Sequence, residues 1–419
     1  MASLITFILG YLCIAFEHQL RLNKSSTALI TGVICWTLYA LGGTAHEVVS
    51  EKLLAHMGEI SGILFFLLGA MTIVELIDAH DGFELISSAI KTQNKQKILF
   101  IISIIAFFLS AILDNLTTTI VLISLMTKLI QDKHEKFYFA SMIVIAANAG
   151  GAWSPIGDVT TTMLWMNGQI SAAVIIKEVF LPSVISIIIP LIAISFQLKN
   201  NTPITVTETL TKTNHSTSKV ILFAGILSLL FVPAFKSLTG LPPFMGMLLS
   251  LGIMWLLSEI INHQKDTEAS DTLSIKSALK NIDTPSILFF LGILISVAAL
   301  QSVGILSELA QSLSNWIGNT KIIVMALGGL SAIIDNVPLV AATQGMYSLS
   351  EFPMDHPFWI FMAYCTGTGG SMLIIGSAAG VAAMGIAKIE FFWYVRKISF
   401  WVLLGYLSGA LTFLAMSWL

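Results

Sequence analysis

Three carboxylates lie inside long apolar stretches of the 419-residue chain: Asp114, Asp158 and Asp335. Amide or hydroxyl residues follow each of them, in the runs DNLTTT, DVTTT and DNVP. Carboxylate, amide, hydroxyl and carbonyl oxygens are hard ligands, which favour a small hard cation. No Cys and His residues with the spacing of a zinc site accompany them. The residue types therefore predict a site for a small cation and not for a soft transition metal.

A carboxylate in an apolar environment also binds protons readily, because burial disfavours its charged form. Such a side chain can hold either Na⁺ or a proton, and alternating exposure of that site to the two sides of a membrane is antiport. Asp114 and Asp335 can instead serve as helix N-caps at hairpin tips, and the two roles are compatible. Asp158 follows a segment rich in Gly and Pro and precedes three threonines, which favours ion binding.

The composition places these residues in a lipid bilayer. Hydrophobic residues make up 56% of the chain and charged residues 11%, whereas soluble domains carry about 25% charged residues. The mean hydropathy is +0.86. These values exclude a soluble enzyme, a nucleic-acid-binding protein and a secreted module. The net charge of −3 without a long basic run also predicts no nucleic-acid partner.

Membrane-spanning helices need about 20 mostly apolar residues. The stretches that we expect to span the membrane are 2–16, 26–43, 59–79, 137–167, 171–198, 219–236, 243–262, 285–306, 357–388 and 398–419. Residues 44–58 are expected to form an outside loop, and residues 263–284 a cytoplasmic loop.

Two further apolar stretches, 98–130 and 320–349, are interrupted by Asp-Asn pairs at 114–115 and 335–336. Each is too long for one span, so we predict re-entrant hairpins that enter and leave the membrane on the same side. With the N-terminus outside, this topology puts most of the 21 Lys and Arg residues on the inner side, as the positive-inside rule requires.

Gly and Pro residues interrupt two of the predicted spans. Gly150, Gly151, Pro155 and Gly157 lie within 137–167, and such a cluster cannot sustain a regular helix. The run TGTGGS followed by IIGS has the same effect in 357–388. Irregular backbone at this depth is tolerated only where it is buried in protein or lines a water-filled cavity. We therefore predict two discontinuous helices that present carbonyls to a cavity.

The interrupted elements occur twice in the same order. LDN at 113–115 recurs as IDN at 334–336, and the Gly-Gly pair at 150–151 recurs at 369–370. The predicted fold is an all-α polytopic membrane protein with two inverted repeats, each holding a re-entrant hairpin and a discontinuous transmembrane helix. Residues 1–198 form the first repeat, 199–218 a cytoplasmic linker and 219–419 the second repeat. This architecture is typical of secondary transporters, and no phosphate-binding GxxxxGK[ST] loop indicates an ATP-driven pump.

Four segments resemble the NhaD family of sodium/proton antiporters: LDNLTTTIVLISL (113–125), NAGGAWSPIGDVTTTMLW (148–165), IDNVPLVAA (334–342) and GTGGSMLIIGSAAGVAAMG (367–385). The resemblance extends from about residue 60 to residue 390. It implies electrogenic exchange of Na⁺ or Li⁺ for H⁺ in a bacterial inner membrane, driven by the proton gradient and serving sodium extrusion and pH homeostasis. The ion transporter superfamily to which that family belongs also suggests a homodimer.

The resemblance marks polar positions in both halves as cation- or proton-binding. These positions are Asp114, Asn115, Thr117, Asn148, Asp158, Thr160, Thr161, Ser331, Asp335, Asn336, Ser371 and Ser377. We expect Na⁺ at Asp158, Asn148, Asp114 and Thr160. No cofactor is expected besides the transported ions, and the expected partners are the lipid bilayer and small cations.

Alternative functions remain open within and outside that superfamily. Its divalent-anion/sodium symporters carry Ser-Asn-Thr at the hairpin tips, where this chain has Asp114 and Asp335. An acidic tip repels a dicarboxylate and favours a cation, so antiport is preferred to anion symport or an arsenite-type permease. An intramembrane aspartyl protease needs Gly-x-Gly-Asp, and Pro155 stands where the first Gly belongs, so we expect no enzyme. Ser377 corresponds to Asp158, which puts a second cation site in doubt.

Overall fold

The computed structural model describes residues 2–15, 17–20, 22–85, 92–130, 132–198, 215–262 and 273–416. In these ranges the protein is helical and contains no strand, as predicted. Most of the predicted linker, residues 199–214, lies outside the described residues, as do residues 263–272 of the predicted loop 263–284.

The first half contains helices α1 to α10. Their bounds are α1 Ala2–Ala15, α2 Glu17–Leu20, α3 Lys24–Leu41, α4 His46–Ala79, α6 Lys95–Leu113, α7 Asn115–Leu129, α8 Lys133–Ala152, α9 Val159–Met166 and α10 Ala172–Gln197. The second half contains α11 to α22. Their bounds are α11 His215–Thr239, α12 Pro243–Asn262, α14 Ile275–Asn281, α15 Thr284–Val303, α16 Ile305–Ile317, α17 Thr320–Leu330, α18 Asn336–Met346, α19 Pro357–Gly369, α20 Ala378–Ala387, α21 Phe391–Tyr394, a π-helical turn Val395–Ser399 and α22 Phe400–Met416.

Seven helices in the described ranges are long and apolar enough to cross a membrane. They are α4, α6, α10, α11, α12, α15 and the continuous segment Phe391–Met416. Large apolar side chains such as Leu227, Leu256 and Phe223 are exposed on these helices, as expected for surfaces that face lipid. The protein is therefore a polytopic membrane protein.

The structure corrects two of the predicted connections and shows one helix that was not predicted. Residues 46–58 are the first turns of the 34-residue α4 and not a loop, because they contain good helix formers and no Pro. Residues 275–281, expected in a loop, form α14. The chain also forms α16 after α15, where Gly304 turns the backbone with φ of 87°.

The predicted interruptions fall where the sequence placed them. A single residue, Asp114 with φ of 94°, separates α6 from α7, and residues 331–335 separate α17 from α18. Residues 153–158 interrupt α8–α9, and residues 370–377 interrupt α19–α20. The two predicted hairpins differ in length: α6 alone is long enough to cross a membrane, whereas α17 and α18 have 11 residues each.

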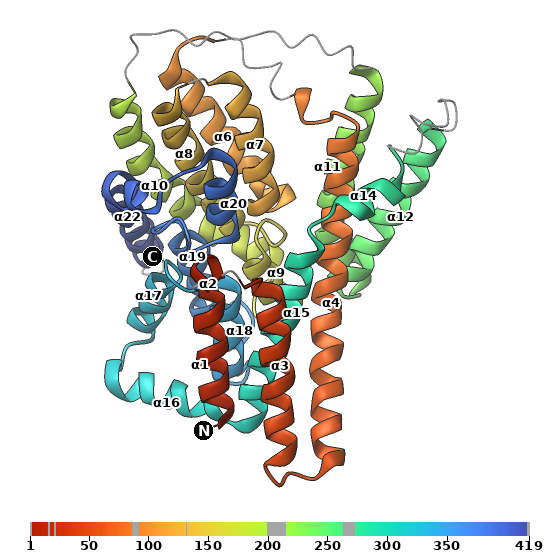
Figure 1. Ribbon diagram of the computed structural model, residues 1–419, viewed down its shortest axis with the longest axis vertical. Helices are drawn as coiled ribbons and strands as arrows, with labels where there is room; N and C mark the ends of the chain where they lie inside the picture. Colours follow the sequence, from red (N-terminus) through yellow and green to blue (C-terminus); the bar gives the residue numbers. More distant parts are fainter. Residues whose placement is uncertain are drawn as a thin grey trace.

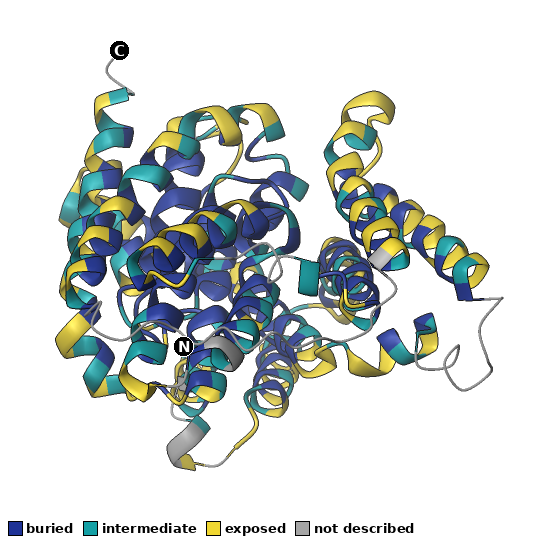
Figure 2. Ribbon diagram, turned by 90° about the horizontal axis from the view of Figure 1, so that it is seen from above, coloured by how far each residue is buried: buried dark blue, intermediate teal, exposed yellow. Residues whose placement is uncertain are grey.

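The helices pack into a larger body with an outlying group beside it. Figure 1 shows α4, α11, α12 and α14 to one side of the body that contains α8, α10, α19 and α22. Seen from above in Figure 2, buried residues concentrate in this body. Helices of the two halves pack against each other in this body: α7 contacts α20, and α18 contacts α9. Each interrupted pair of one half therefore touches the second segment of the other half's broken helix.

Candidate cation-binding site

The first break is fixed by close contacts of its backbone. A side chain at Gly150 would collide with the carbonyl of Phe107, and one at Gly151 with the carbonyl of Gly157. The hydroxyl of Ser154 donates to the carbonyl of Ala111 at 2.5 Å. The break is thereby held against the end of α8 and against α6, and it delivers Asp158 to the start of α9.

Asp158 is buried, with 2% of its surface exposed. Its Oδ1 accepts a hydrogen bond from the backbone N–H of Thr160 at 3.4 Å, and its Oδ2 accepts one from Nδ2 of Asn336 at 3.1 Å. We call Asp158, Thr160 and Asn336 the carboxylate cluster. Asn336 is the first residue of α18, so both halves contribute to this cluster.

Some oxygen atoms of the carboxylate cluster make no hydrogen bond, and none of its described partners is basic. The buried hydroxyls of Thr160 and Thr161 make no hydrogen bond. Within the described ranges, none of the ion pairs includes Asp158. The cluster is therefore a negatively charged, oxygen-rich site that can accept a small cation.

A second cluster consists of neutral side chains. Nδ2 of Asn115 donates to Oδ1 of Asn148 at 3.0 Å. Nδ2 of Asn148 donates to Oγ of Ser371 at 2.8 Å and to Oγ of Ser377 at 2.9 Å. All four residues are buried. We call them the amide cluster, and it too joins the two halves, because the serines lie in the second break.

The second break repeats contacts of the first. A Cβ at Gly157 would lie 2.7 Å from the carbonyl oxygen of Ser110, and one at Gly376 would lie 2.6 Å from that of Ser331. The hydroxyl of Ser331 donates to a carbonyl of α19 at 3.0 Å, and the hydroxyl of Ser110 donates to a carbonyl of α8 at 2.6 Å. Ser331, expected at the site, thus supports the backbone around the break.

The two acidic residues at the interruptions cap helices. Oδ1 of Asp114 accepts from the backbone N–H of Thr117, and its Oδ2 accepts from the Thr117 hydroxyl, both at 2.8 Å. Oδ1 of Asp335 accepts from the backbone N–H of Val337 at 3.1 Å. The backbone N–H of Asp335 donates to the hydroxyl of Tyr11 at 3.0 Å. Both carboxylates are only partly buried.

The four residues expected to hold Na⁺ lie in three different hydrogen-bonded groups. Asp158 and Thr160 share the carboxylate cluster, Asn148 lies in the amide cluster, and Asp114 bonds to Thr117. Sequence reasoning missed Tyr11, which lies in an apolar span and gives no signal of its contact.

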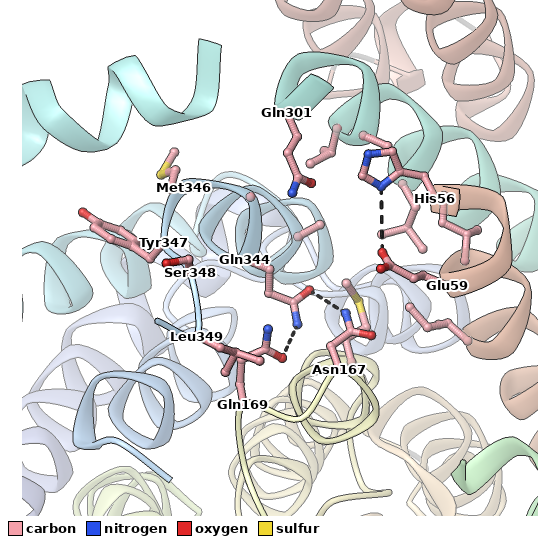
Figure 3. A pocket seen from close by; sticks show the side chains of 18 of the residues that line it. His56, Glu59, Asn167, Gln169, Gln301, Gln344, Met346, Tyr347, Ser348 and Leu349 are labelled. Carbon is pink, nitrogen blue, oxygen red and sulfur yellow. Dashed lines mark hydrogen bonds and ion pairs between the residues drawn. The ribbon is translucent and has the colours of Figure 1, made fainter. Parts of the chain in front are cut away.

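A cavity of about 540 Å³ lies along α9 and α18. Figure 3 shows His56 and Glu59 on one side of it, with Asn167, Gln169 and Gln344 opposite. Nδ2 of Asn167 donates to Oε1 of Gln344 at 3.4 Å, and Nε2 of Gln344 donates to Oε1 of Gln169 at 3.0 Å. No Lys or Arg is among the described residues that line it. Because α9 and α18 both begin in the carboxylate cluster, the cavity follows the helices that carry the site.

Comparisons with known proteins agree with this architecture. The family model described as citrate transporter (CitMHS) matches residues 11–351. Sodium/proton antiporter 1 of Arabidopsis thaliana is 48% identical over 99% of this chain and 72% of its own length. Sodium/proton antiporter 2 of the same plant is 48% identical over 98% of both chains. The Na⁺/H⁺ antiporter NhaD of Vibrio cholerae is 29% identical over 99% of this chain and 91% of its own length. The chain therefore belongs to the citrate transporter (CitMHS) family, among its NhaD-type sodium/proton antiporters.

Proposed function

We propose that the protein is a secondary active transporter that exchanges Na⁺ or Li⁺ for H⁺ across a membrane. The observation that carries the proposal is the buried carboxylate of Asp158, which has an amide partner but no basic one. An uncompensated charge at this depth costs several kcal/mol, so binding of either a cation or a proton stabilises the site. The antiporter names of the relatives support this pair of ions.

We further propose that residues 1–198 and 219–419 are inverted repeats joined by the cytoplasmic linker 199–218, and that 98–130 and 320–349 are re-entrant hairpins. The recurrence of the same glycine and serine contacts at both breaks supports a repeat. The reciprocal packing of α7 on α20 and of α18 on α9 supports a two-fold relation between the halves. In this arrangement each cluster forms only where the halves meet.

We propose that the polar cavity, which is lined by Met163 of α9 and Ala341 of α18, is the access route to the site from one side. Its acidic residues, Glu59 and Glu351, and the absence of Lys and Arg from its described lining favour cations over anions. The hydrogen bonds of Asn167, Gln344 and Gln169 link the end of α9 to α18. Movement of these helices relative to one another would change access to Asp158, as alternating access requires.

We also propose that exchange is electrogenic, is driven by the proton gradient and serves sodium extrusion and pH homeostasis. We propose a homodimer in a bacterial inner membrane. The relatives named above come from a plant and a bacterium, so they support an ion-transporting membrane protein without selecting the membrane.

A second candidate is sodium-coupled anion symport, which the description of the family as citrate transporter favours. The carboxylates of Asp158 and of Asp335, which directly precedes its partner Asn336, oppose it, because they would repel a dicarboxylate. The two functions differ in their requirements: antiport needs only Na⁺ or Li⁺ and a proton gradient, whereas symport needs the anion.

Transport in everted vesicles with a ΔpH-sensitive dye tests the proposal. Na⁺ or Li⁺ should dissipate the gradient without any added organic anion. Asp158→Asn should abolish this response while the protein remains in the membrane in normal amount. The responses of Asp114→Asn and Asp335→Asn in the same assay show how far exchange depends on the other two carboxylates. Normal exchange by Asp158→Asn would overturn the proposal, and a strict requirement for an anion would favour symport.

A further inference from the structure

The two clusters have the same plan, and besides the difference between Asp158 and Ser377 they differ at Asn148 and Gly367. Asn148 of α8 faces Ser371 and Ser377 at the second break. Gly367 of α19 faces the matching residues of the first break: a Cβ built on it would lie 2.8 Å from Cβ of Ala152 and 3.5 Å from Oδ2 of Asp158. Asn148 and Gly367 thus stand in corresponding places, one with an amide side chain and the other with none.

The difference changes how each cluster is connected. In the amide cluster, the side chain of Asn148 lies between Asn115 and Ser377 and bonds to both. In the carboxylate cluster, Asn336 reaches Asp158 directly. The amide of Asn148 therefore lies beside Ser377, whereas the corresponding residue beside Asp158, Gly367, has no side chain.

We infer that Gly367 is a specificity-determining residue of the cation site, because any side chain at this position would lie against the carboxylate of Asp158, and that Asn148 fills the corresponding position in the other cluster. This inference rests on the proposed function and deepens it. It assigns a single cation-accepting position to the pair of clusters and says why that position lies at Asp158.

The dimensions of the site support this role. Oxygen ligands hold Ca²⁺, a cation of similar size to Na⁺, at about 2.3–2.6 Å. A methyl group 3.5 Å from Oδ2 of Asp158 would be in van der Waals contact with that oxygen and would keep an ion from approaching it on that side. Li⁺ is the smaller ion and needs less of this space. A side chain at position 367 should therefore weaken Na⁺ binding more than Li⁺ binding.

The test must distinguish the effect of a side chain on the Asp158 carboxylate from its effect on the packing of α19 against α8. Gly367→Ala alone would also press on Ala152, so the informative variant is the double substitution Gly367→Ala with Ala152→Gly, which removes the atom at 2.8 Å. Ala152→Gly alone is one control. Gly385→Ala on α20 is a matched glycine control, because a Cβ there meets nothing within 4 Å. Initial rates of Na⁺- and Li⁺-dependent ΔpH dissipation in everted vesicles give KM for each ion.

We expect the double variant to raise KM for Na⁺ about tenfold or more, the discrimination that one buried methyl group supplies, and to raise KM for Li⁺ less than threefold. Both controls should keep the parent values, and retained Li⁺ exchange by the double variant shows that it is folded. Unchanged KM for both ions, or an equal loss of both, would overturn the role of Gly367 and leave the proposed function standing. Absence of Na⁺ and Li⁺ exchange in the parent protein would overturn both.

Discussion

The breaks at 153–158 and 370–377 share a backbone design and differ in the side chains that it presents. In each, glycines let the broken helix approach its neighbours closely, and a serine hydroxyl bonds to a carbonyl of the helix before the break. The first break ends in Asp158 and the second in Ser377, and both residues cap the helix that follows. The two broken helices therefore position their side chains in the same way, and only the first presents a carboxylate whose charge a cation or a proton can neutralise.

The largest effect should come from removing this difference. Asp158→Ser gives the first break the residue of the second, and we expect loss of detectable Na⁺/H⁺ exchange because the site loses its only charge. Ser377→Ala removes a neutral hydrogen-bonding group and should leave exchange measurable. Dye-based ΔpH assays with membrane abundance as the control compare the two. Equal activity of both variants would mean that the halves do not differ in function.

The amides of the two clusters should also differ in importance. Asn336→Ala removes the donor to a charged oxygen of Asp158, a bond worth about 1.5–3 kcal/mol, so KM for Na⁺ should rise about tenfold or more. Asn115→Ala removes a neutral bond to Asn148 and should change KM less. The same vesicle assay, with Na⁺ titrated, measures both. A larger effect of Asn115→Ala would reverse the assignment of the cation site.

The amide cluster should matter more for stability than for ion selectivity. Asn148→Ala leaves Asn115, Ser371 and Ser377 without their common partner, at a cost of about 1–3 kcal/mol for unsatisfied buried groups. The thermal unfolding temperature of the detergent-purified protein should fall. The ratio of Na⁺ to Li⁺ KM should stay near that of the parent. A changed ratio with an unchanged melting temperature would contradict this division of roles.

The smallest effects should fall on the contacts that the breaks share. Ser110→Ala and Ser331→Ala each remove one hydroxyl bond to a helix carbonyl, and each should lower stability by about 0.5–1.5 kcal/mol. Because the two contacts are alike, the two melting temperatures should fall by similar amounts. A strong loss of transport in only one variant would show that its serine does more than hold the backbone.

Local sequence patterns predicted the interruptions well. Gly and Pro destabilise a regular helix, and Asp and Asn favour helix N-caps, wherever they occur. The breaks at 114, 153–158, 331–335 and 370–377 could therefore be predicted without tertiary information. The extension of α4 and the presence of α16 were missed. Polar helical turns at a membrane surface have the same composition as loops, and hydropathy cannot separate the two.

The polar residues that lie close together were easier to predict than their hydrogen-bond partners. Asn115, Asn148, Ser371 and Ser377, expected on the basis of resemblance, lie in one hydrogen-bonded cluster. Their separation from Asp158, and the contact of Tyr11 with Asp335, depend on how distant helices pack. Gly367 has no side chain that could signal a function in the sequence, so its proposed role became apparent only from comparison with Asn148 in the structure.

The exchange of contacts between the halves has a consequence for biosynthesis. Asp158 is translated long before Asn336, and until α18 is in place its carboxylate has no amide to accept from. A product truncated between these residues would insert Asp158 into the bilayer without the amide donor of Asn336 and without the packing of α18 on α9. Transport competence should therefore arise late, when the last helices settle, and shortened chains would be natural substrates for membrane proteases.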